Sequence, residues 1–147
     1  NIDVGGGTSK IAICIAGKVR EVTAIDVGAR LVVIDGNGVV TRLEEAGRYF
    51  GAAAGLDLGV GKKIELAKLQ PMVALMADKL FEVVSLSPLS AETRSLLRIP
   101  PLSYSGKIDA ITFSGGVSEF IYGYGTLDRF SLTGHTHFFQ MRLQTSF

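Results

Sequence analysis

Residues 1–12 read Asn1-Ile2-Asp3-Val4-Gly5-Gly6-Gly7-Thr8-Ser9-Lys10-Ile11-Ala12. Apolar residues before the glycines and alternating apolar residues after them predict two strands, at 1–4 and 10–16. The three glycines between them indicate a turn whose backbone can approach a ligand closely. Backbone amides and the Thr8 hydroxyl can donate to phosphate, and Asp3 can hold hydrated Mg²⁺ or a water molecule. The pattern therefore indicates either a phosphate-binding turn or a plain glycine-rich β-turn.

The rest of the chain combines further strands with helices. We expect a strand at 19–26, a hairpin that pairs 31–34 with 39–42, helices at 44–54, from Pro71 to the Ser87-Pro88 break and at 91–97, and a strand at 109–113. Short connections between the first strands imply that they run antiparallel. The sequence therefore predicts an α/β fold, with a mixed sheet that is antiparallel in its N-terminal part and has flanking helices.

A second glycine motif follows the strand expected at 109–113. It reads Phe113-Ser114-Gly115-Gly116-Val117-Ser118-Glu119, and a helix is expected to begin at Val117. A strand, a glycine pair and a helix start together present backbone amides to a ligand. The two glycines would let a flat base lie against the backbone, with Glu119 one turn inside the helix. The alternative is an ordinary connection between a strand and a helix.

Composition narrows the class of protein. The 147 residues suffice for one ordinary domain, and 47% hydrophobic with 20% charged residues excludes a disordered chain. Fifteen basic and fourteen acidic residues nearly cancel, so no charge-driven binding to nucleic acid is expected. No apolar run reaches the roughly 18 residues of a membrane span. The single cysteine, Cys14, is expected to be an inert core thiol in a reducing, cytoplasmic compartment.

The two ends of the chain are unusual. The sequence begins at Asn1, without methionine and within a strand-like run, so we expect a C-terminal fragment of a longer protein. Residues 125–147 contain no Ala, Val, Ile, Lys or Glu, and we interpret them as an atypical, poorly packed tail after a domain at 1–124. A reading-frame change near Tyr124 would produce this shift. His135 and His137 could share a strand face, but a complete metal site there is not expected.

Taken together, the two glycine motifs resemble the second ATPase subdomain shared by actin, Hsp70 chaperones and sugar kinases, which has an actin/Hsp70-like (ribonuclease H-like) fold. Four blocks narrow this resemblance to the family of reactivating proteins of ethanolamine ammonia-lyase (EutA). The blocks are residues 1–12, Asp26-Val27-Gly28-Ala29-Arg30-Leu31-Val32, Arg42-Leu43-Glu44-Glu45-Ala46-Gly47-Arg48 and 113–123. The resemblance covers residues 1 to about 124.

The resemblance implies roles for particular residues. Asp3 would be the catalytic carboxylate that orients Mg²⁺ and the attacking water. Phosphate contacts would come from Gly5, Gly6, Gly7 and Thr8, and nucleoside contacts from Gly115, Gly116 and Glu119. Asp26 and Arg30, on either side of Gly28, would contact the nucleotide or the lyase, or else form a local ion pair.

The resemblance also implies cofactors and a partner. Members of the family resemble chaperones that use ATP and Mg²⁺ to eject damaged cobalamin from ethanolamine ammonia-lyase. In this superfamily a second phosphate loop lies upstream, and this chain has no second DxGxT-like turn. We therefore expect ATPase activity of a full-length parent, and very weak or absent nucleotide binding by this chain alone.

Other interpretations remain open. The chain could be a truncated, non-catalytic interaction module, or it could belong to another ATPase or sugar-kinase-like enzyme of the same superfamily. Apolar surface is expected to be exposed where the upstream subdomain would pack, which favours self-association.

Overall fold

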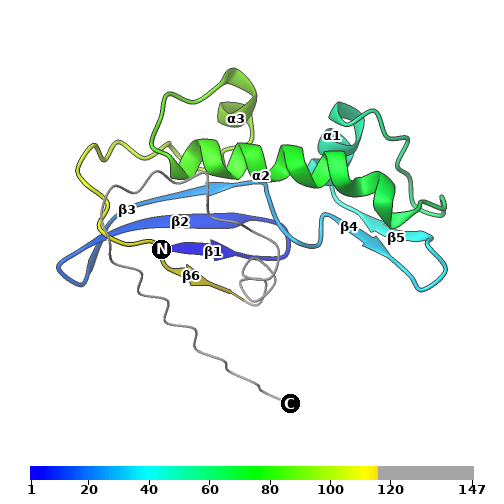
Figure 1. The fold of residues 1–147 in the computed structure, drawn as a ribbon, viewed down its shortest axis with the longest axis horizontal. Helices are drawn as coiled ribbons and strands as arrows, with labels where there is room; N and C mark the ends of the chain where they lie inside the picture. Colours follow the sequence, from blue (N-terminus) through cyan, green and yellow to red (C-terminus); the bar gives the residue numbers. More distant parts are fainter. Residues whose placement is uncertain (116–147) are drawn as a thin grey trace, which may run out of the picture.

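The computed structural model describes residues 1–115, which form two β-sheets covered by helices (Figure 1). The larger sheet contains β1 (Ile2–Val4), β2 (Ser9–Ile15), β3 (Lys18–Ile25) and β6 (Phe113–Ser114) in the order β3-β2-β1-β6. The first three strands are antiparallel neighbours, whereas β1 and β6 are parallel. The predicted α/β fold, with a mixed sheet and flanking helices, is confirmed.

The register of β1 brings distant parts of the chain together. Val4 lies opposite Ser9 on β2, and Asp3 lies opposite Ser114 on β6. The Ile2 amide donates to the Thr112 carbonyl oxygen over 2.8 Å, just before β6 begins. Because β1 and β6 are parallel, the residues that follow these two strands emerge at the same edge of the sheet.

The smaller sheet is the expected hairpin. It consists of β4 (Val32–Ile34) and β5 (Val40–Leu43), which pair antiparallel. The Asp35 carboxylate accepts hydrogen bonds from the amides of Asn37 and Val39, both 2.9 Å long, and so closes the turn. A short aspartate at this position stabilises a tight connection by bonding the backbone beyond it.

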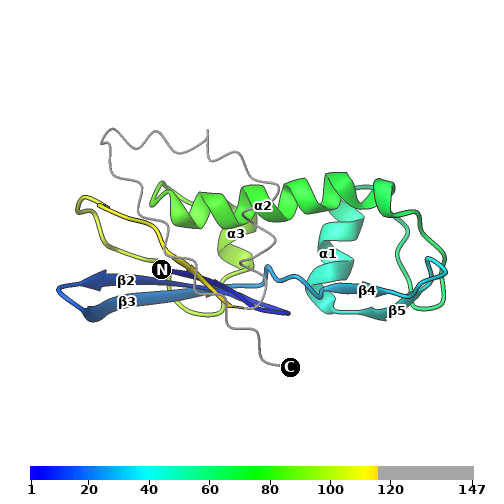
Figure 2. The ribbon, with the colours of Figure 1, turned by 60° about the horizontal axis from the view of Figure 1, so that its bottom comes forward.

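Helices cover one face of both sheets (Figure 2). These are α1 (Glu45–Ala53), the 3₁₀ helix η1 (Leu66–Leu69), α2 (Gln70–Val84) and α3 (Ala91–Ser95). Pro71 lies in the first turn of α2, and Gly55, with a φ of +71°, lies just after the end of α1, where a glycine commonly ends a helix. The sequence did not predict η1. None of the helices within residues 1–115 is both long and apolar enough to cross a membrane.

The core lies between the larger sheet and the helices. One cluster of buried side chains joins Ile2, Val4, Ile11, Ile25, Val27, Leu31, Phe50, Met72, Leu80, Val83 and Leu96. Burial alternates along β1 and through Ser9, Ile11 and Ile13 of β2, and Met72, Leu80 and Val83 are the buried residues of α2. Packing in the core therefore fixes which face of β1 points toward the helices. This also fixes the position of the glycine turn that follows β1.

Two expectations were wrong. The strand expected at 109–113 is reduced to Phe113–Ser114, because only these residues are in register with the three-residue strand β1. Cys14 is exposed rather than buried in the core. The register between β2 and β3 shifts between Ile13 and Cys14, and from Cys14 to Arg20 every residue is exposed.

Candidate functional site

The glycine turn after β1 is closed by its own backbone. The Gly5 amide donates to the Thr8 carbonyl oxygen over 2.9 Å. A Cβ atom on Gly5 would lie 2.9 Å from that same oxygen, so a side chain here would open the turn. Among residues 1–115, no protein atom accepts a hydrogen bond from the amides of Gly6, Gly7 or Thr8. The turn therefore retains three backbone donors for a ligand.

Residues 26–30 hold this turn in place. The Ala29 amide donates to the Gly5 carbonyl oxygen over 3.0 Å, and the Arg30 amide donates to the Gly6 carbonyl oxygen over 2.7 Å. A Cβ atom on the buried Gly28 would lie 2.5 Å from the carbonyl oxygen of Gly6. These contacts engage the carbonyl groups of the turn and leave its amides available.

The start of the second glycine motif lies at the same edge of the sheet. Gly115 has a φ of +88°, and a Cβ atom on it would collide with the Asp3 Oδ1 atom and lie 2.8 Å from the Val4 carbonyl oxygen. The Asn1 side chain joins the strands that lead there, because it accepts from the Ser114 hydroxyl over 3.1 Å and donates to the Thr112 hydroxyl over 3.0 Å. The structure therefore brings Asp3 and Gly115 together, although they are far apart in the sequence.

The exposure of the expected site residues fits a shallow site. Asp3, Gly5, Gly6 and Thr8 are half-buried, whereas Gly7 and Gly115 are exposed. A Cβ atom on Gly7 would meet nothing within 4 Å among the atoms placed. Gly116, Glu119, the helix expected from Val117, the tail at 125–147 and the pair His135 and His137 lie outside the described residues.

Asp26 and Arg30 do not form the local ion pair that was one of the expected alternatives. Asp26 instead pairs with Arg98, and the hydrogen bond from this guanidinium to the carboxylate raises the pKa of Arg98. The Arg30 guanidinium lies over Gly6, where a Cβ atom would be 2.9 Å from its Nε atom. The sequence marked the segment 26–30, but only the fold shows that Gly28 and Arg30 contact the turn.

The carboxylates do not form a ready-made metal cage. Within residues 1–115, no three His, Cys, Asp or Glu side chains gather in a group that could hold a metal ion. Mg²⁺ in phosphate sites is commonly bound through one or two carboxylates together with water and the phosphates themselves. A single carboxylate, Asp3, beside three available amides fits that mode of binding.

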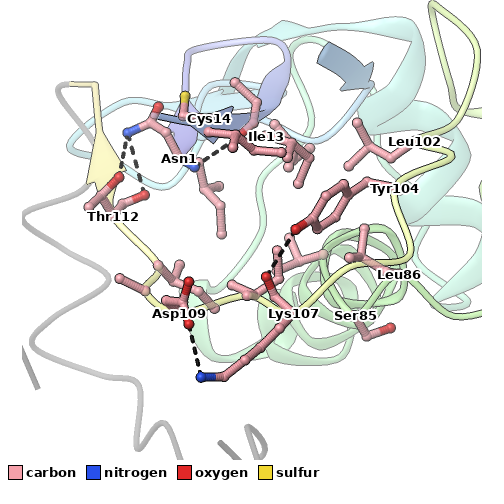
Figure 3. Close-up of a pocket in the computed structure, with 18 of the residues that line it drawn as sticks. Asn1, Ile13, Cys14, Ser85, Leu86, Leu102, Tyr104, Lys107, Asp109 and Thr112 are labelled. Atoms are coloured by element: carbon pink, nitrogen blue, oxygen red, sulfur yellow. Dashed lines mark hydrogen bonds and ion pairs between the residues drawn. The ribbon is translucent and has the colours of Figure 1, made fainter. Parts of the chain in front are cut away.

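A separate cavity of about 520 Å³ lies toward the opposite end of β1 (Figure 3). Its lining includes Asn1, Ile13, Leu86, Leu102 and Tyr104. The Tyr104 hydroxyl donates to the Lys107 carbonyl oxygen over 3.1 Å. The cavity therefore lies between β2, the end of α2 and the segment that precedes β6, and the glycine turn is not part of it.

The fold and this edge define a class: an α/β protein in which the glycine turn after β1 and Gly115, which follows β6, lie at one edge of the sheet with the Asp3 carboxylate. Comparison with known proteins identifies the family. The sequence profile of the family described as "Ethanolamine utilisation protein EutA" matches residues 1–135, and the chain belongs to this family.

Two curated relatives carry the name "Ethanolamine ammonia-lyase reactivase EutA". The protein from Salmonella typhimurium (strain LT2) is 36% identical over 126 residues, which cover 81% of this chain and 25% of the relative. The protein from Escherichia coli (strain K12) is 34% identical over 126 residues, with the same coverage. The chain thus spans about a quarter of the length of these relatives. No solved structure matches it.

Proposed function

We propose that this chain is the nucleotide-binding part of an ATP-dependent reactivating factor for ethanolamine ammonia-lyase, and that its sheet is the second ATPase subdomain of an actin/Hsp70-like fold. The observation that carries the proposal is the meeting of Asp3 with Gly115 at the edge where the 5–8 turn presents its amides. The names of the two relatives support the choice of lyase reactivation as the process.

The residues of the turn fit the phosphates of ATP. Residues 1–115 accept no hydrogen bond from the amides of Gly6 and Gly7 or from the amide and hydroxyl of Thr8. In this proposal these four donors bind phosphate oxygens. Gly5 permits the closed turn, and Gly115 lets the chain pass beside Asp3 without a side chain. In this proposal Gly115, Gly116 and Glu119 contact the nucleoside.

Asp3 has the catalytic role in this proposal. When bound, Mg²⁺ neutralises phosphate charge and orients water. The Asp3 carboxylate would hold the hydrated ion and align the attacking water, since Asp3 lies on β1 two residues before the turn begins at Gly5. Phosphoryl transfer to water requires mainly positioning and charge stabilisation, which a rigid strand end and backbone amides supply.

The relatives' name supports a cellular role in reactivating the lyase. We propose that the energy of ATP binding and hydrolysis is used in the cytoplasm to release damaged cobalamin from the lyase, as a chaperone would. The lyase and ATP or ADP are then the partners. Val19, Val60 and Leu66 are each more than half exposed, which supports a further apolar contact with a partner or a second copy.

The test uses the longest natural polypeptide that contains this sequence, called the parent polypeptide below. Asp3→Ala is expected to lower its ATPase rate by roughly 10²–10³-fold, the usual cost of removing one transition-state contact. Asp57→Ala is the control, because this carboxylate is 87% exposed and pairs only with Lys62 in the described part of the chain. The ATPase rate is measured by phosphate release.

A second readout addresses the lyase. Ethanolamine ammonia-lyase loaded with damaged cobalamin should regain activity with the parent polypeptide, Mg-ATP and adenosylcobalamin, and should not regain it with Asp3→Ala. ATP turnover without reactivation would instead support another ATPase or a sugar-kinase-like enzyme. A parent polypeptide that binds no Mg-ATP would overturn the proposal in favour of a non-catalytic interaction module.

A further inference from the structure

Arg30 is a cation that the fold places directly on the glycine turn. Its amide donates to the Gly6 carbonyl oxygen over 2.7 Å, which fixes the backbone at the start of the side chain. A Cβ atom on Gly6 would lie 2.9 Å from the Arg30 Nε atom and 3.1 Å from Nη2. The guanidinium therefore occupies the space that any side chain at position 6 would fill.

The charge of Arg30 is not neutralised by a neighbour in the described structure. Within residues 1–115 no carboxylate lies within ion-pair distance of its guanidinium, and the side chain is exposed. Asp26, the acidic residue of the same segment, is paired with Arg98 instead. The charge over Gly6 is thus available to an anion.

We propose that Arg30 is a phosphate-binding residue, which contacts the phosphate groups of a nucleoside di- or triphosphate from the side of the turn formed by Gly6. A guanidinium carries several donors in a planar fork that matches phosphate oxygens, and its charge is permanent. The turn supplies the amides of Gly6 and Gly7 next to it. This assignment rests on the proposed nucleotide site and adds a specific cation to it.

In this proposal the absence of a side chain at Gly6 leaves room for the Arg30 guanidinium. The flexible end of Arg30 would yield to a Cβ atom at position 6, so Gly6→Ala is expected to displace the guanidinium without blocking the fold. Gly6→Ala and Arg30→Gln should therefore weaken phosphate binding in the same way, although only one of them removes the charge.

The test compares nucleotides that differ only in phosphate, by calorimetry on the parent polypeptide. Arg30→Gln should lower affinity for Mg-ATP and Mg-ADP roughly tenfold to a hundredfold, the effect of one charge-assisted contact, and leave affinity for adenosine unchanged. Arg30→Lys should recover part of the loss, because it restores the charge without the fork. Arg20→Gln is the matched control, since Arg20 is exposed and lies near the β2–β3 turn, at the other end of these strands.

The outcomes separate the two proposals. If the unchanged protein binds Mg-ATP and Arg30→Gln binds it equally well, Arg30 is not a phosphate ligand and the nucleotide site stands. Equal losses for Mg-ATP and adenosine would show that Arg30 only shapes the turn, which also overturns the assignment. If the unchanged protein binds no Mg-ATP, both proposals fail together.

Discussion

At the scale of single residues, the position of the glycine turn depends most directly on the close approach of Gly28 to its backbone. It is buried, and a Cβ atom on it would lie 2.5 Å from two backbone atoms, the Gly6 carbonyl oxygen and the Gly7 carbonyl carbon. Backbone atoms cannot rotate away as a side-chain end can. A methyl group at position 28 must therefore move the turn or the segment 26–30.

We expect Gly28→Ala to lower the free energy of unfolding by roughly 1–3 kcal/mol, the usual cost of overpacking. Gly36→Ala is the matched control, because a Cβ atom there meets nothing within 4 Å. It should change stability by less than about 0.5 kcal/mol. Urea unfolding followed by circular dichroism measures both, and equal midpoints for the two variants would show that the turn tolerates the methyl group.

At the scale of elements, a polar cluster joins α2 to α3. The Glu82 carboxylate of α2 accepts hydrogen bonds from the Ser90 amide and hydroxyl and from the Thr93 hydroxyl. Lys79 lies 3.8 Å from the same carboxylate and donates to the Ser90 hydroxyl over 3.2 Å. Ser90 also caps α3 by accepting from the Thr93 amide. The start of α3 therefore depends on one carboxylate of α2.

This cluster makes stability depend on pH. Burial raises the pKa of Glu82, but the hydrogen bonds from Thr93 and Ser90 and the charge of Lys79 outweigh it, so the pKa is lowered from its ordinary value of 4.5. The folded state therefore favours the charged carboxylate. Its contribution to stability is present above pH 4.5 and is lost as the pH falls through the lowered folded-state pKa.

We expect Glu82→Gln to lower the free energy of unfolding at pH 7 by about 1–3 kcal/mol, because hydrogen bonds to a charged group are lost. The difference from the unchanged chain should shrink as the pH falls below 4.5, the ordinary pKa. Urea unfolding between pH 7 and 3.5 measures this difference in stability. Glu65→Gln is the control, because the Glu65 side chain is largely exposed. A difference that stays constant over the whole range would rule out the charged carboxylate as its source.

At the scale of the whole molecule, the proposed nucleotide site occupies one edge of the larger sheet. Asp3, the 5–8 turn and Gly115 lie at one edge of one sheet, and the chain spans about a quarter of its curated relatives. In the superfamily that the sequence resembles, the nucleotide lies between two subdomains. A single edge offers contacts to only one side of such a ligand.

We therefore predict that residues 1–147 alone bind Mg-ATP at least a hundredfold more weakly than the parent polypeptide, if the parent polypeptide extends beyond them. A loss of half of the contacts corresponds to several kcal/mol, and each 1.4 kcal/mol is tenfold in affinity. Isothermal titration calorimetry decides this. Micromolar affinity of the isolated chain would show that the second side is not needed.

Much of the local structure could be predicted from the sequence. The alternation of Ile11 and Ile13 predicted β2, and the hairpin expected to pair 31–34 with 39–42 and the helix expected at 44–54 also agree with the structure. Each of these signals acts between near neighbours. The exposure of Cys14 could not be predicted, because it depends on the irregular pairing of β2 with β3 at this residue and on where the packed part of the sheet ends.

The sequence by itself determined the glycine turn, the strands on both sides of it and the EutA family, because these depend on residues close together in the chain or on the order of motifs. Only the tertiary structure decided that Gly28 and Arg30 contact the turn and that Gly115 lies against Asp3. Those contacts follow from the parallel pairing of β1 with β6 and from the return of the chain after β3. The spacing of residues along the chain does not predict such pairing, because the pairing is fixed by the burial of apolar residues in one common core.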